Sequence, residues 1–158
     1  MSRLLQGCFG VVLLSTLVAA SSSGQSASDP QRIADDPDTG LFMRICNDCH
    51  DSKQIVSRRR TRADWEEVIN KMMQEGLNGT EKDLETIFAY LNRNYGRVFI
   101  NRAPADEIVA ILTVSQKDAE AIVAYRKTSG PFADLDALRK VPGIDLKKIE
   151  DRKDAIAF

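Results

Sequence analysis

Three short motifs of the form Ser/Thr-x-x-Asp recur along the 158-residue chain, and each is followed by apolar residues three or four positions apart. The motifs begin at Thr61, Thr80 and Ser115. In such a capping box, the hydroxyl and the carboxylate accept hydrogen bonds from backbone N–H groups that the first helical turn leaves unpaired. Apolar residues at this spacing share one face of a helix, which can then be buried. The chain is therefore expected to fold as an all-α protein.

The same spacing predicts where the helices lie. The helix after Thr61 carries Trp65, Val68, Ile69 and Met72 at positions i, i+3, i+4 and i+7, and it is expected to end before a glycine. The helices after Thr80 and Ser115 are also expected to end before glycines. Shorter helices are expected to begin at Asp38 or Thr39, at Pro104, near Phe132 and after Asp145, the last extending toward Ile156.

The first of these short helices leads into Cys46-Asn47-Asp48-Cys49-His50, a C-x-x-C-H motif. This spacing is typical of covalent attachment of a c-type haem. Two thiols one helical turn apart can form thioethers to one porphyrin, and the following histidine can bind the iron. A disulfide or a dithiol oxidoreductase site is the alternative for such a cysteine pair. A structural zinc site would need four ligands, which the expected mature chain lacks.

His50 is the only histidine in the sequence, so a second histidine ligand from the same chain is excluded. The sixth iron ligand is then expected to be a methionine, a less common group such as lysine, or no protein group. Met72 lies near the centre of its apolar helix face, whereas Met73 lies at the edge. We therefore expect Met72, ahead of Met73 or Met43, to be the ligand.

The N-terminus has the pattern of an export signal. Arg3 precedes an uncharged apolar run, 8–20, that ends in small residues. Residues 1–20 are therefore expected to be a signal peptide, with an uncleaved anchor as the alternative, and 21–37 a flexible leader. The protein is expected to be exported to a bacterial periplasm, with no integral membrane segment after cleavage. Charge is nearly balanced, with 22 Lys and Arg against 23 Asp and Glu, so no overall field favours nucleic acid.

Residues 46–96 resemble a small class I-type cytochrome c domain, and are most similar to the haem-binding domains of quinohaemoprotein amine dehydrogenase alpha subunits. The resemblance includes the C-x-x-C-H motif, the basic loop 58–60, a Trp-led helix with Met72 one turn before Gly76, and the closing helix with Tyr90-Leu91. It implies one covalently bound haem c per chain, held by Cys46, Cys49, His50 and Met72, with iron bound by His50 and Met72. Arg58, Arg59, Arg60 or Arg62 is expected either to pair with a haem propionate or to belong to a solvated loop.

The second half resembles the tandem helix-hairpin-helix module of competence-type DNA receptors. The matching residues are Asn101-x-Ala103, 119–126, Gly130-Pro131-Phe132 and 141–144. In that family two glycines per hairpin bring backbone N–H groups to DNA phosphates, without reading sequence. Here Thr113 and Ser115 replace the glycines of the first hairpin, and Asp145 replaces one of the two in the second, which keeps Gly143.

Residues 101–158 also contain ten acidic and ten basic side chains, whereas DNA-binding modules usually show a basic surface. The module is therefore expected to serve for docking, with DNA binding as the alternative. Together the two resemblances predict a cytochrome c domain over 38–97 and a helix-hairpin-helix domain over 98–158. The expected function is one-electron transfer to redox partner proteins, with no substrate chemistry of its own. The alternative is a DNA-binding or scaffold protein with an accessory or sensing haem.

Overall fold

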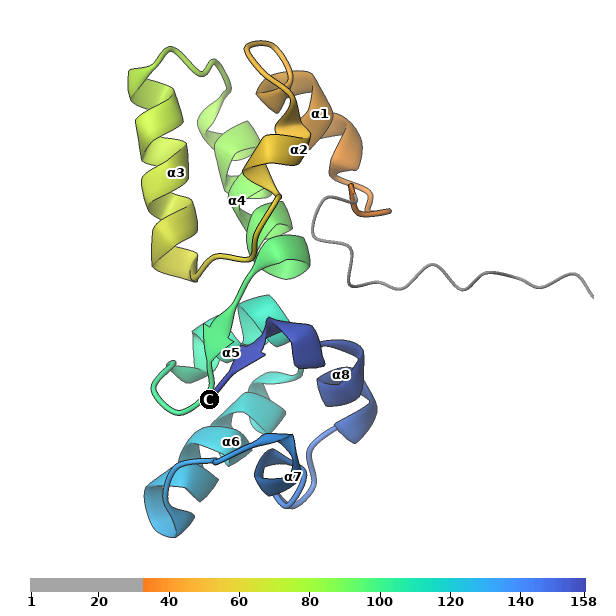
Figure 1. The fold of residues 1–158 in the computed structure, drawn as a ribbon, viewed down its shortest axis with the longest axis vertical. Helices are drawn as coiled ribbons and strands as arrows, with labels where there is room; N and C mark the ends of the chain where they lie inside the picture. Colours follow the sequence, from red (N-terminus) through yellow and green to blue (C-terminus); the bar gives the residue numbers. More distant parts are fainter. Residues whose placement is uncertain (1–32) are drawn as a thin grey trace, which may run out of the picture.

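The computed structural model describes residues 33–158, which are mainly helical (Figure 1). The predicted signal peptide and most of the predicted leader lie outside these residues. The first half contains α1 (Thr39–Cys46), α2 (Ser52–Ile55), α3 (Arg62–Gln74) and α4 (Glu81–Tyr95). The second half contains α5 (Ala105–Leu112), α6 (Gln116–Ser129), α7 (Leu135–Leu138), α8 (Leu146–Asp151), the 3₁₀ turn η1 (Lys153–Ala155) and two strands, β1 (Val98–Phe99) and β2 (Ile156–Ala157). The predicted all-α fold class is confirmed.

The three predicted capping boxes all form. Thr61, Thr80 and Ser115 each accept a hydrogen bond from the backbone N–H three residues later, and the Asp at that position accepts one from the backbone N–H of the cap residue. The helices that follow end beside glycines, as the sequence predicts. Gly76 and Gly130 have φ angles of +98° and +90°, which an L side chain rarely adopts.

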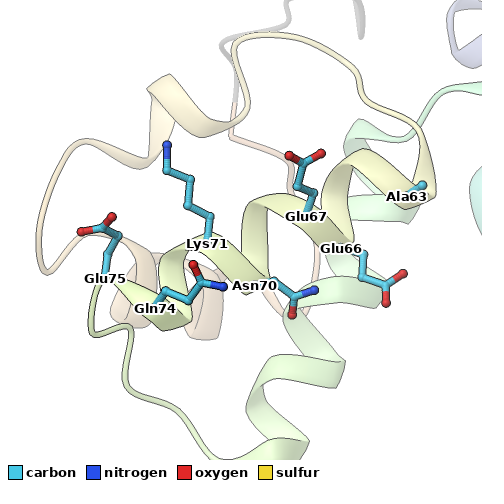
Figure 2. Close-up of a pocket in the computed structure, with 7 residues that line it drawn as sticks. All are labelled: Ala63, Glu66, Glu67, Asn70, Lys71, Gln74 and Glu75. Atoms are coloured by element: carbon cyan, nitrogen blue, oxygen red, sulfur yellow. The ribbon is translucent and has the colours of Figure 1, made fainter.

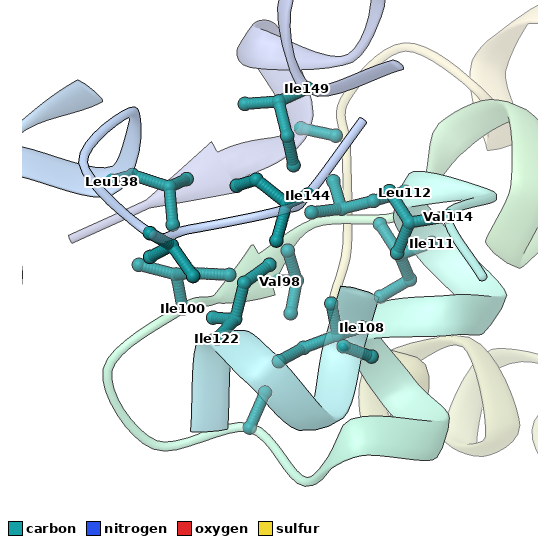
Figure 3. Close-up of a cluster of buried hydrophobic side chains, with 14 of the residues drawn as sticks. Val98, Ile100, Ile108, Ile111, Leu112, Val114, Ile122, Leu138, Ile144 and Ile149 are labelled. Carbon is teal, nitrogen blue, oxygen red and sulfur yellow. The ribbon is translucent and has the colours of Figure 1, made fainter. Parts of the chain in front are cut away.

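Two clusters of buried side chains hold the described residues together. The first lies among α1, α3 and α4 and includes Trp65, which is fully buried and donates a hydrogen bond from Nε1 to the Tyr95 carbonyl at 3.1 Å. The second lies in the other half and is built largely from isoleucine, leucine and valine (Figure 3). Tyr95 belongs to the first cluster and Val98 to the second. The domain boundary between residues 97 and 98 stays a prediction.

The connection between the halves is tightly packed. Gly96 follows α4, and a Cβ atom built on it would lie 2.2 Å from the Asn92 carbonyl oxygen and 2.8 Å from Ile111 Cγ1. Helices α4 and α5 are in contact across this connection. Only glycine fits this position without a shift of the backbone.

Three local features differ from the predictions. Ile156 lies in β2, which pairs in parallel with β1 through the register Val98↔Ile156, and not in a longer last helix. The expected polar loop after His50 contains the short helix α2. The end of the expected flexible leader is held in place, because Arg93 donates hydrogen bonds to the Asp36 carboxylate at 2.7 and 2.8 Å. Across residues 33–158, no helix combines the length and the apolar character that a membrane span requires.

Candidate nucleic-acid interface

The first hairpin joins α5 to α6 through a residue with a left-handed backbone. Thr113 has φ +55° and ψ +27° and is the one non-glycine residue with positive φ in the described part of the chain. A β-branched residue pays a steric cost in this conformation, which glycine adopts freely. Thr113 therefore has a backbone conformation that favours glycine. This agrees with the sequence resemblance, in which Thr113 replaces a glycine of the first hairpin.

The second hairpin joins α7 to α8 through Gly143. Its φ angle is +77°, and no atom lies within 4 Å of the position that a Cβ would take. Asp145 caps α8, since its carboxylate accepts the Lys148 backbone N–H at 3.2 Å. The Asp145 carboxylate, which stands where the family pattern has a glycine, thus has a structural role as a helix cap.

Asp118 is a buried acidic residue at the start of α6, close to both hairpin tips. Its side chain is 7% exposed and accepts hydrogen bonds from the Ser115 backbone N–H at 3.2 Å and from the Ser115 hydroxyl at 2.7 Å. The backbone of Asp145 in the second hairpin lies close enough to this carboxylate to lower its pKa. The Ser115 hydroxyl is the main reason that the pKa of Asp118 lies below its usual value. The Asp118 carboxylate therefore caps α6 and lies close to the second hairpin loop.

Two residues of the second half that match the family pattern, Asn101 and Arg126, have structural roles. Asn101 exchanges two hydrogen bonds with the Phe132 backbone, at 2.7 and 2.8 Å. Arg126 donates to the carbonyls of Ile100 and Ala103. These contacts fasten the entry segment to the chain after α6, so they position the hairpins and do not face a ligand.

Cations around the hairpin tips divide into paired and unpaired side chains. Arg139 is held by Asp136 and Glu150, and Lys147 pairs with Asp151 at 2.7 Å. Within residues 33–158, the ammonium groups of three exposed lysines near the tips have no ion pair and no hydrogen bond. They are Lys117, Lys140 and Lys148. The second tip therefore combines an open glycine loop with nearby lysines that form no ion pair within the described residues, and the charge of one of them, Lys148, helps to lower the pKa of Asp118.

The structure also brings together the four residues predicted to bind a cofactor. Cys46, Cys49, His50 and Met72 line one largely apolar cavity of about 340 Å³ in the first half. Burial raises the pKa of the Cys46 thiol to about 11. Cys49 and His50 are exposed, and Met72 is half-buried. The remaining lining residues are mainly apolar: Ile45, Ile55, Val68, Ile69, Glu75, Leu77, Ile87 and Leu91.

Other residues assigned to this cavity lie elsewhere. Met73 is 48% exposed and does not line it, which separates Met73 from Met72. Trp65 and Phe88 are not among its lining residues either. The Arg62 guanidinium instead lies 4.9 Å from the centre of the Phe88 ring.

Comparisons with known proteins found a family match and several relatives that are similar over part of the chain. Residues 93–156 match the family model described as the helix-hairpin-helix motif. A 59-residue segment is 41% identical to the ComE operon protein 1 of Bacillus subtilis (strain 168), covering 37% of this chain and 29% of that protein. A 60-residue segment is 43% identical to an uncharacterized protein of Haemophilus influenzae, covering 37% of this chain and 54% of that protein. The chain thus spans about half or less of the length of these relatives. No solved structure matches the chain significantly.

These findings correct the predicted function. The family match and the relatives support a helix-hairpin-helix segment, and none of them indicates a cytochrome. In residues 33–158, no group of three or more His, Cys, Asp or Glu side chains could hold a metal ion. The predictions of a haem c cofactor and of electron transport between redox partners are therefore overturned. The same findings favour the alternative prediction, a helix-hairpin-helix protein that binds DNA or acts as a scaffold, over the predicted electron carrier.

Proposed function

We propose that this chain binds DNA through its helix-hairpin-helix segment, residues 93–156, and holds the phosphate backbone without reading base sequence. The observation that carries the proposal is the tip of the second hairpin, where Gly143 forms an open positive-φ turn beside the capped start of α6. Loops of this kind can present backbone N–H groups to an anion. The match to the helix-hairpin-helix motif and the likeness to the ComE operon protein 1 support the same function. The sequence of residues 1–20 has the pattern of an export signal, so we also propose that the protein is exported and acts in a bacterial periplasm.

Duplex DNA of about 25 base pairs is expected to bind the full chain with a dissociation constant of about 1 to 100 μM at physiological salt, in the range of non-specific binding. The logarithm of the association constant should fall linearly with the logarithm of salt concentration, with a slope of about −2 to −4. Unrelated sequences of equal length should bind equally. Fluorescence anisotropy of labelled duplexes across a salt series measures all three quantities.

The matched variants are Gly143→Ala and Gly130→Ala. Both place a side chain at a positive φ with open space around it, so their conformational cost is similar. Gly143 lies at a hairpin tip, whereas Gly130 lies at the opposite end of α6 from Ser115. We expect about fivefold weaker DNA binding for Gly143→Ala and less than twofold for Gly130→Ala. Absence of salt-dependent binding by the wild type would refute the proposed function.

A second candidate site is the apolar cavity of the first half. We propose that Cys46, Cys49, His50 and Met72 bind a ligand there, since sulfur and nitrogen groups converge on an otherwise apolar wall. Met72→Leu is expected to weaken retention of that ligand, whereas the exposed Met73→Leu is not. Native and denaturing mass spectrometry of the exported protein, with a count of free thiols, tests this. A native mass equal to that of the bare chain, with both thiols free, would contradict it.

A further inference from the structure

The helix-hairpin-helix segment, residues 93–156, has only a small excess of positive charge for a DNA-binding module, with 12 basic and 10 acidic side chains. Positive charge is concentrated instead just outside that segment, in the loop between α2 and α3. We propose that this arginine loop, residues 58–60, together with Lys71 of α3, is a second phosphate-binding surface that holds the DNA backbone beside the hairpins. This inference rests on the proposed DNA-binding function.

The arginine loop and α3 form an open hollow of about 430 Å³. Its lining contains four cationic residues, two acidic residues and one apolar residue: Arg58, Arg59, Arg60, Lys71, Asp64, Glu67 and Val68. The Asp64 carboxylate is engaged in the capping box with Thr61, which leaves Glu67 as the one acidic group of the lining without that role. The hollow therefore has a net positive charge.

Two of these cations are available to a ligand. Arg58 and Lys71 are exposed, and within residues 33–158 their side chains make no ion pair and no hydrogen bond. Figure 2 shows Lys71 projecting from the same side of α3 as Glu67. A guanidinium can bind two phosphate oxygens at once, and an ammonium adds a compact charge. This pair is suited to consecutive phosphates of a nucleic-acid strand.

The loop that carries these cations is fixed to the end of α4. The Arg60 backbone N–H donates to the Tyr95 carbonyl at 3.1 Å, and the Arg97 N–H donates to the Arg60 carbonyl at 2.7 Å. Arg59 Nη1 donates to the Gly96 carbonyl at 3.3 Å. The loop consequently keeps a set position relative to residue 98, where the second half begins.

Positive charge continues from the loop onto the second half. In Figure 1 the segment between α2 and α3 runs beside the end of α4 that leads into β1. Arg59 lies close enough to Arg97 and to Asp154 for both charges to influence its pKa. Arg152 is half-buried, and burial and the nearby Arg59 and Arg93 lower its pKa. A polyanion bound at the hairpins would therefore find further cations across the junction.

The test is the salt dependence of DNA binding by Arg58→Gln/Lys71→Gln, a double variant of the full chain. The matched control is Lys53→Gln/Lys82→Gln, which removes the same charge from exposed positions that do not line the hollow. We expect the first double variant to bind duplex DNA about tenfold more weakly at low salt, with a slope smaller by about 2 because two phosphate contacts are lost. The control should change affinity less than twofold.

Equal behaviour of the two double variants, while Gly143→Ala still weakens binding, would overturn the arginine-loop proposal and leave the proposed function standing. Failure of the wild type to bind DNA would overturn both. Circular dichroism of each variant should match the wild type, because all four substituted side chains are exposed.

Discussion

Replacement of Gly96 by alanine is expected to lower the free energy of unfolding by about 3 kcal/mol, within the range for overpacking at a buried site. A Cβ at this position would lie 2.2 Å from the Asn92 carbonyl oxygen, which is backbone and cannot rotate away. It would also lie 2.8 Å from Ile111 in α5, so relief requires the two halves to move apart. Urea unfolding followed by circular dichroism and by Trp65 fluorescence measures the change.

Gly40→Ala is the control for that experiment. Gly40 lies in the first turn of α1, and no atom lies within 4 Å of the position of its Cβ. Alanine there should leave stability unchanged or raise it slightly, because it favours the helix. Equal midpoints for Gly96→Ala and the wild type would show that the connection between the halves is not tightly packed.

The Asp118→Asn variant is expected to be about 2 kcal/mol less stable than the wild type at pH 7, because a buried carboxylate that accepts two hydrogen bonds from Ser115 is replaced by a neutral amide. The pKa of Asp118 is lowered in the folded state, mainly by the Ser115 hydroxyl. Its stabilising contribution is therefore fully present above the usual aspartate pKa near 4, and it is lost as pH falls through the lower folded-state pKa. The difference between wild type and variant should shrink as pH falls below about 4. Chemical unfolding at several pH values measures it.

Asp106→Asn is the matched control, since Asp106 is exposed in the first turn of α5 and forms no side-chain hydrogen bond within the described residues. Its effect should stay below about 0.5 kcal/mol at pH 7. If Asp118 holds the hairpin tips together, Asp118→Asn should also weaken DNA binding more than Asp106→Asn does. A stability difference that does not change between pH 7 and pH 3 would contradict the role given to the carboxylate.

The candidate DNA site was partly visible in the sequence. Gly143 and the position of Thr113 could be identified from the hairpin pattern, and the structure gives both a positive φ. The predicted function was wrong because the five-residue motif at Cys46 was given more weight than a hairpin pattern that extends over some sixty residues. The balanced charge of residues 101–158 also argued against DNA binding. That count includes Asp145, whose carboxylate is engaged in capping α8.

The sequence alone determined the three longest helices, their caps and their ends. These features depend on residues within about four positions of each other, such as Thr61 with Asp64, and so local chemistry is sufficient to specify them. The tertiary structure decided everything that joins distant segments. The pairing of Val98 with Ile156 and the anchoring of the arginine loop at Tyr95 both arise from packing. Such contacts follow from how buried faces meet in space, which no local spacing encodes, and they place the arginine loop beside the start of the second half.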